Sequence, residues 1–177
     1  MNLHMRRNAL LVCMGISVTA LVAPGVWQAR TRIAYNPSDS VARGWYRITP
    51  DVVPDSLRVG SIVLARLPDS VAAFAAQRGY LPSDVPILKR IGAVAPQSVC
   101  VRAQVVRIDR DAVATTRLHD GAHRPLSAWA QCRPLAGGEL FLLSNTNPVS
   151  FDSRYFGPID SSAVLGVARP LWTWGAQ

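Results

Sequence analysis

Residues 98–108 read Ser-Val-Cys-Val-Arg-Ala-Gln-Val-Val-Arg-Ile, and apolar and polar side chains alternate along this stretch. A period of two puts the apolar side chains on one face of an extended chain, so the pattern predicts a half-buried β-strand. Residues 109–111, Asp-Arg-Asp, are typical of the turn that would follow it. This part of the chain therefore indicates a β fold.

Apolar runs on both sides of this stretch predict further strands, which cover residues 60–67, 86–94, 139–143 and 163–168. One helix is expected over residues 71–77, with Asp69 or Ser70 as its N-cap and Gly79 at its end. We therefore expect a mainly β protein, in which residues 31–177 form one domain of coiled antiparallel sheets.

The first 30 residues differ in character, because residues 9–27 form a run of 19 residues without a charge. A helix of that length spans about 28 Å, close to the thickness of a bilayer core. A cleaved signal peptide is the alternative, but the end of the run, Ala-Pro-Gly-Val-Trp-Gln-Ala, lacks a small-x-small cleavage site. We expect residues 1–30 to form a cytoplasmic tip and a single transmembrane helix that contacts membrane lipid.

The cysteines bear on the compartment. Cys13 lies within the apolar run, and Cys100 and Cys132 are the only pair in the rest of the chain. A disulfide between them would imply an oxidising compartment, and two unpaired buried thiols are the alternative. We expect the disulfide, and with it a protein of the inner membrane whose globular domain lies on the periplasmic side.

The basic residues exclude one class of function and indicate another. The formal charge is +8, but the basic residues are scattered and do not alternate with aromatics, so no nucleic-acid partner is expected. Of the 19 basic residues only Lys89 is a lysine, and it lies in the apolar stretch of residues 85–91. Codon preference explains the excess of arginine, but not the position of the exception. A buried lysine can lose its proton and an arginine cannot, so Lys89 is a candidate general base.

Metal and cofactor chemistry have weak support. His119 and His123 are four residues apart, but they lie in a polar stretch with Gly and Pro that predicts a loop, and no third ligand is evident. No glycine-rich phosphate loop and no Gly-x-Ser-x-Gly pattern occur. A Ser-His-Asp triad stays open on spacing alone, because triads are assembled in space. We expect no metal and no cofactor.

Two polar segments are candidates for the remaining site residues. Ser38 and Ser40 are two residues apart, so an extended chain presents both hydroxyls on one side, one as nucleophile and one as oxyanion donor. In residues 150–157, Asp152 and Arg154 can pair to fix a loop, and Ser150 can hydrogen-bond an amine. The alternative for both segments is a structural turn.

Together, these segments resemble the type I signal peptidases, Ser/Lys endopeptidases that remove signal peptides, and above all their conjugative-transfer branch, the TraF-type peptidases. The nucleophile segment of that branch, Asn-x-(Ser/Thr)-x-Ser-x-Pro-x-Gly-x-Tyr, is matched by Asn36, Ser38, Ser40, Gly44 and Tyr46, with Ala42 in place of the proline. Its Lys-Arg is matched by Lys89 and Arg90, and its Ser-x-Asp-Ser-Arg-x-x-Gly box by residues 150–157. Housekeeping members carry Gly-Asp-Asn before that box, whereas residues 144–146 read Ser-Asn-Thr here, which favours the conjugative-transfer branch.

The resemblance implies a membrane-bound serine endopeptidase that processes a protein precursor, such as a pilin subunit or a protein with a signal peptide. It implies Ser40 as nucleophile, Lys89 as general base, and Ser38 with the backbone N–H of Ser40 as the oxyanion hole. Ser150 would orient the lysine, supported by Asp152 and Arg154. Two alternatives remain: a housekeeping signal peptidase, and a catalytically silent, membrane-anchored component of a secretion or conjugation channel.

Overall fold

The computed structural model describes residues 8, 11–14, 16–17, 32–50, 56–144 and 146–175. The chain divides into two compact units, Met1–Arg32 and Ile33–Gln177. Most of the expected membrane helix, residues 9–27, lies outside the described residues. Within the described part, no helix combines the length and the apolar character that a membrane crossing requires.

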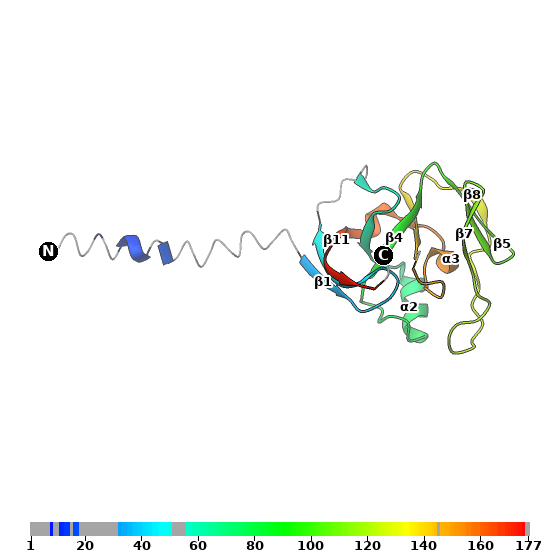
Figure 1. Cartoon of the computed structure of the whole chain (residues 1–177), viewed down its shortest axis with the longest axis horizontal. Coiled ribbons are helices and arrows are strands. Elements are labelled where there is room, and N and C mark those ends of the chain that lie inside the picture. The colour runs from blue at the N-terminus through cyan, green and yellow to red at the C-terminus, as the bar shows by residue number, and fades with distance from the viewer. Residues whose placement is uncertain are drawn as a thin grey trace. The chain divides into compact units, whose positions relative to one another are not determined.

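The larger of two sheets carries the strands that later form the site. It has seven strands in the order β1-β2-β11-β3-β4-β9-β10, and the pairings from β2 to β10 are antiparallel. Strands β1, β4 and β11 of this sheet are labelled in Figure 1. Its strands are β1 Arg32–Asn36, β2 Arg43–Thr49, β3 Ile62–Ala65, β4 Ile87–Val94, β9 Glu139–Leu143, β10 Ile159–Asp160 and β11 Val164–Trp174. The mainly β, antiparallel architecture expected from the sequence is thus confirmed.

The smaller sheet has four strands in the order β7-β6-β5-β8, and it corrects one expectation. Its strands are β5 Ser98–Arg102, β6 Val105–Ile108, β7 Asp111–Thr115 and β8 Cys132–Pro134. Residues 98–108 are therefore a hairpin and not one strand. Ala103 and Gln104 form its turn with φ of 48° and 63°. The buried positions are Val99 and Val101 before the turn and Val106 and Ile108 after it, so the two-residue turn shifts the alternation by one residue. Cys100 pairs with Cys132 across β5 and β8, and the expected disulfide joins them.

The helices are short. Helix α2 spans Asp69–Gln77, and its N-cap is Pro68, so the expected side-chain cap from Asp69 or Ser70 is wrong. Both residues lie inside the first turn instead, and Gly79 follows the helix with φ of 70°, as expected. Helix α3 spans Ser153–Phe156, and a 3₁₀ turn, η2, spans Ser161–Ala163.

Strand β4 is the structural centre of the domain. It pairs with β3 on one side and β9 on the other, and Ile87, Leu88 and Ile91 are buried along it. A large apolar cluster packs Ile87 and Ile91 against α2, and a separate cluster packs Leu88 against β2. The middle of β4 therefore lies between two strands and two apolar clusters, so side chains there are largely buried.

Candidate active site

The turn between β1 and β2 carries the two candidate serines, and Asn36 holds that turn together. The Nδ2 of buried Asn36 donates to the carbonyls of Ser38, Val41 and Ala42 at 2.9, 3.2 and 3.1 Å. Its Oδ1 accepts from the backbone N–H of Ser38 at 3.2 Å and from the Ser38 hydroxyl at 2.8 Å. One asparagine side chain thus satisfies both sides of the loop, so the turn is ordered.

The same turn brings the serine hydroxyls together. Ser38 Oγ and Ser40 Oγ are 2.8 Å apart, and Ser40 Oγ also donates to the carbonyl of Leu88 at 3.3 Å. Ser40 is only 6% exposed. The loop that follows is fixed by Tyr46, which is fully buried and donates its hydroxyl to the Ala42 carbonyl at 2.6 Å. Ala42, which replaces the usual proline, is therefore held by a tyrosine from β2 and by Asn36.

Lys89 lies at the centre of β4, next in the chain to the carbonyl that Ser40 contacts. It is 6% exposed, and its Nζ donates to Ser150 Oγ at 2.5 Å. Burial lowers the pKa of the Lys89 ammonium from 10.5 to about 8; Asp152 opposes this change and Arg154 adds to it. Lysine is thus partly neutral near physiological pH, which arginine at this position would not be.

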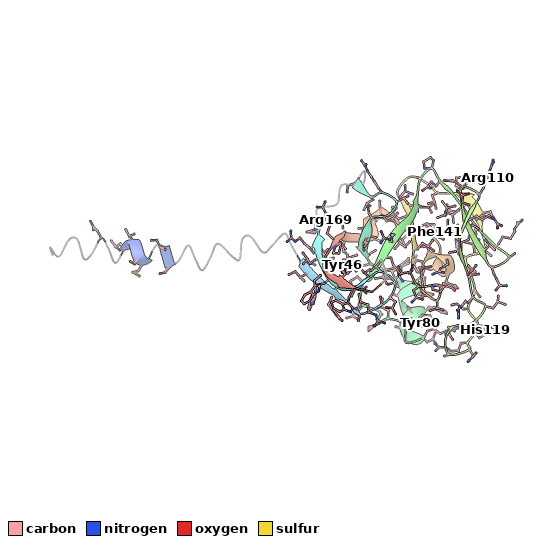
Figure 2. The ribbon with its side chains drawn as sticks, in the orientation of Figure 1. Tyr46, Tyr80, Arg110, His119, Phe141 and Arg169 are labelled. Atoms are coloured by element: carbon pink, nitrogen blue, oxygen red, sulfur yellow. A yellow bond between two sulfur atoms is a disulfide. The ribbon has the colours of Figure 1, made fainter. Side chains whose placement is uncertain are left out.

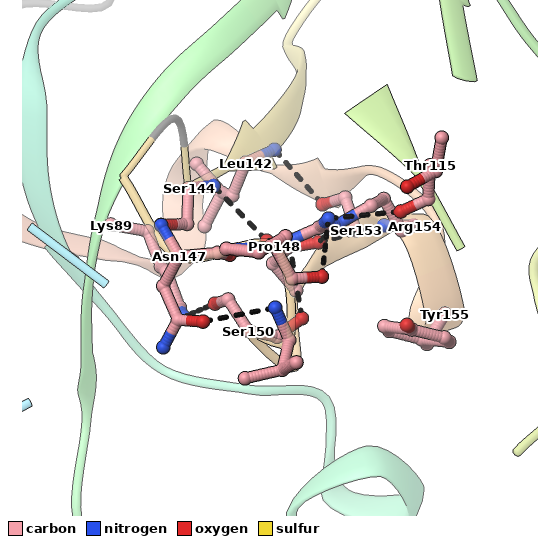
Figure 3. Close-up of polar contacts among 12 residues, drawn as sticks. Lys89, Thr115, Leu142, Ser144, Asn147, Pro148, Ser150, Ser153, Arg154 and Tyr155 are labelled. Atoms are coloured by element: carbon pink, nitrogen blue, oxygen red, sulfur yellow. Dashed lines mark hydrogen bonds and ion pairs between the residues drawn. The ribbon is translucent and has the colours of Figure 1, made fainter. Parts of the chain in front are cut away.

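The loop that carries Ser150 is held from behind by a buried ion pair (Figure 3). Arg154 Nε and Nη2 each donate to Asp152 at 2.8 Å, and these side chains are 1% and 0% exposed. Arg154 also donates to the carbonyls of Asn147, Pro148 and Ser150 at 3.2, 3.1 and 3.3 Å. A guanidinium that binds three carbonyls of one loop fixes the path of that loop, and with it the hydroxyl that meets Lys89.

Two more contacts connect this assembly to its neighbours. Asp152 accepts from the backbone N–H of Ser144 at 3.0 Å, at the end of β9. The hydroxyl of Thr146 donates to the carbonyl of Asp39 at 2.7 Å, which links the Ser150 loop to the serine turn. The site therefore joins three segments that are remote in sequence: residues 36–42, strand β4 and residues 144–154.

The hydroxyls and the amine face a common cavity of about 680 Å³. Its lining includes Ser38, Ser40, Lys89 and Ser150, together with apolar side chains such as Leu64 and Ile87. The expected site residues are thus brought together, with Asp152 and Arg154 behind the wall. Ser40 Oγ meets Ser38 and the Leu88 carbonyl in this arrangement, and no contact with Lys89 Nζ occurs among those described.

The sequence did not predict that Asn36, Tyr46 and Thr146 hold the loops of the site through side-chain hydrogen bonds. Asn36 and Tyr46 were part of the motif, and an amide at the start of a tight serine turn is a signal for side-chain bracing. His119 and His123 are exposed in the loop between β7 and β8. Among the residues that the structure describes, no group of three His, Cys, Asp or Glu side chains can hold a metal.

Comparison with known proteins gives independent evidence on the family of this protein. Residues 5–174 match the family model for signal peptidase, peptidase S26. The probable conjugal transfer protein TraF of Sinorhizobium fredii is 31% identical over 96% of this chain and 93% of its own length. The plasmid transfer protein TraF of Escherichia coli is 29% identical over 96% and 98%, and the conjugal transfer protein TraF of Agrobacterium tumefaciens 32% identical over 95% and 97%.

Among solved structures, a signal peptidase I of Enterococcus faecalis matches with a TM-score of 0.38 and 18% identity, over 62% of this chain and 94% of that one. The family assignment depends on the sequence matches, which extend over nearly the whole chain. The protein belongs to the signal peptidase family, peptidase S26, and is similar throughout its length to the TraF proteins of conjugal and plasmid transfer.

Proposed function

We propose that this protein is a membrane-bound serine endopeptidase that cleaves a translocated precursor protein, with Ser40 as nucleophile and Lys89 as general base. The observation that carries the proposal is the buried amine of Lys89, 2.5 Å from Ser150 Oγ, in the same cavity as Ser40. A buried lysine with a pKa of about 8 is a base that a scaffold protein does not need.

In the first step, neutral Lys89 takes the proton of Ser40 Oγ as this oxygen attacks the carbonyl carbon of the scissile bond. The lysine then gives the proton to the leaving amine, and an acyl ester remains on Ser40. At pH 7.4 a pKa of about 8 leaves about one lysine in five neutral. Ser40 Oγ contacts the carbonyl of Leu88, the residue before Lys89, so the nucleophile lies beside the strand position that carries the base.

The oxyanion of the tetrahedral intermediate would accept from the backbone N–H of Ser40 and the hydroxyl of Ser38. The Ser38 hydroxyl lies 2.8 Å from both Asn36 Oδ1 and Ser40 Oγ, so Asn36 keeps it at the site before substrate binds. One such donor is typically worth about 3–4 kcal/mol in the transition state. Ser150, held by Arg154, would orient the amine of Lys89 towards the nucleophile.

The names of the relatives, conjugal or plasmid transfer protein, support a specialised precursor over a broad set. We take the substrate to be a subunit of a transfer apparatus, such as a pilin, whose acyl-enzyme is resolved by water or by an amine of the substrate itself. The cytoplasmic membrane, with the domain on the periplasmic side, fits both the uncharged segment of residues 9–27 and the disulfide between Cys100 and Cys132.

The test is cleavage of a precursor peptide with Ala-x-Ala before the cut, by the full chain in detergent. Ser40→Ala and Lys89→Arg should each abolish cleavage, and circular dichroism should show that both variants keep the fold. Arginine retains the charge and most of the aliphatic stem but cannot act as a base. A folded Lys89→Arg variant with near wild-type activity would refute the mechanism, and a wild-type protein that cleaves no precursor would favour the silent assembly component.

A further inference from the structure

The cavity that holds the candidate serines has a basic end, formed by Arg78, Arg117 and Arg124. Arg78 follows α2, and the other two lie on the loop between β7 and β8. Asp120 is the only acid among the described residues of the lining, so three guanidinium groups face one carboxylate. This end of the cavity therefore has a net positive charge even when Lys89 is not counted.

Both oxygens of Asp120 are occupied by groups of its own loop and of the segment that follows α2. Its Oδ2 accepts from Tyr80 OH at 2.6 Å, Arg124 Nε at 2.8 Å and Arg78 Nη1 at 3.3 Å, and its Oδ1 accepts from the backbone of Ala122 and Arg124. Desolvation opposes ionisation, but the hydrogen bonds from Tyr80 and Arg124 hold the pKa of Asp120 well below its usual range. Asp120 remains a carboxylate that orders the loop and offsets one arginine.

Arg117 is the one of the three arginines whose side chain does not bind Asp120. Its backbone N–H donates to Tyr155 OH at 3.1 Å, so its position in the loop is fixed. Its side chain is exposed and makes no hydrogen bond or ion pair with any residue that the structure describes. The exposed guanidinium of Arg117 lines the cavity on an ordered backbone, so it is a suitable partner for a carboxylate.

Aromatic packing connects this basic end to the candidate catalytic groups. Phe151, next to Ser150, stacks on Tyr155 with ring centroids 5.9 Å apart and lies 5.2 Å from the ring of Tyr80. Tyr80 in turn reaches Asp120. One phenylalanine and one tyrosine thus lie between Ser150 and the basic loop, and both ends line the same cavity, so one bound peptide can contact both.

We infer that the basic end of the cavity binds an acidic group of the substrate peptide, a Glu or Asp side chain or a terminal carboxylate close to the cut, and that Arg117 determines this preference. The inference rests on the proposed peptidase function and adds a substrate class to it. The apolar wall near Ser40 would accept small side chains, whereas the acidic group would fix the register of the peptide.

The experiment uses peptides with Ala-x-Ala before the cut in which one residue at a time, on either side, is Glu, Gln or Lys. The wild-type protein should cleave the Glu peptide with a kcat/KM about fivefold above the Gln peptide at one or more positions, the range of an exposed ion pair. The ratio should fall at 0.5 M NaCl, because salt screens exposed charges. Arg117→Gln should bring it towards one, and Arg117→Glu should favour the Lys peptide.

Arg110→Gln is the matched control. Arg110 is an exposed arginine in the turn between β6 and β7, at the opposite end of the domain from His119 and Tyr80 (Figure 2), and it does not line the cavity. It should keep the wild-type ratio. Equal rates for the Glu and Gln peptides at every position, or equal effects of Arg110→Gln and Arg117→Gln, would overturn the inference.

Binding separates this inference from the proposed function. The Ser40→Ala variant should bind the Glu peptide more tightly than the Gln peptide in calorimetry, whether or not the wild-type protein cleaves either one. A preference for the Glu peptide in binding, without cleavage, would support the subsite for an acidic group and refute the peptidase proposal. Cleavage of both peptides, with no preference in binding or rate, would do the reverse.

Discussion

Replacement of Lys89 by methionine should remove a pH-dependent cost to the fold. Methionine has a similar length and no charge, so it fits the same apolar surroundings. The pKa of Lys89 is 10.5 without burial and about 8 in the folded protein. This difference of about 2.5 corresponds to about 3 kcal/mol of folding free energy that the buried charge removes.

The sign follows from proton binding. Between pH 8 and 10.5 the unfolded chain holds the lysine proton and the folded chain does not, so the free energy of unfolding rises with pH in that window. Below pH 8 the cost is present in full. The stability of the wild type relative to Lys89→Met should therefore be constant up to about pH 8 and then rise by about 1.4 kcal/mol per pH unit.

Urea denaturation of both proteins at pH 7, 8, 9 and 10 measures this difference directly. Burial raises the pKa values of Tyr46 and Tyr80, but both tyrosines are present in both proteins, so their contributions cancel in the difference. A difference that does not change between pH 8 and 10 would mean that Lys89 keeps its proton when folded. The proposed base would then have no neutral form to work with.

Three further predictions concern the buried ion pair behind the site and the disulfide of the smaller sheet. Arg154→Met should shift the alkaline rise of kcat/KM to higher pH, because the remaining Asp152 raises the pKa of Lys89. Asp152→Asn should shift the rise to lower pH, because the remaining Arg154 lowers that pKa. The pH–rate profiles of the two variants measure both shifts, and shifts in the same direction would contradict the reasoning. Each variant should also lose about 3–5 kcal/mol of stability, since the remaining charge is buried and unpaired. Replacing Cys100 and Cys132 by serine should cost about 3–4 kcal/mol in urea denaturation, from the chain entropy of a 32-residue separation, and an unchanged midpoint would show that the bond constrains little.

Sequence periodicity predicted strands well where one face is buried, and less well where the chain turns. Strand β9 coincides with the expected residues 139–143, and β4 begins one residue after the expected start. The turn at Ala103 and Gln104 escaped because neither residue is the Gly or Asn that positive φ normally favours. The N-cap of α2 was misplaced for a related reason: two good capping residues, Asp69 and Ser70, lie inside the helix.

For the site, the sequence supplied the reactive groups but not what holds them. Ser40, Lys89 and Ser150 have recognisable chemistry and recognisable neighbours, so they could be named in advance as candidates. The contact from Thr146 to the Asp39 carbonyl spans 107 residues, and nothing local to either residue indicates it. Arg117 likewise has an ordinary sequence context, and only the tertiary structure brings it to the same cavity as Ser40.

The buried pair of Asp152 and Arg154 has a consequence for Lys89 beyond the shape of the loop. A lone buried carboxylate near Lys89 would stabilise the ammonium and undo the effect of burial. Because Arg154 binds both oxygens of Asp152, the two charges act on Lys89 in opposite directions, and desolvation remains the largest cause of its low pKa. The pair of Asp152 and Arg154 therefore holds the Ser150 loop by many hydrogen bonds, while its net charge near Lys89 is close to zero. A methionine at position 89 would give a more stable fold at neutral pH, so a lysine there is better explained by chemistry than by folding.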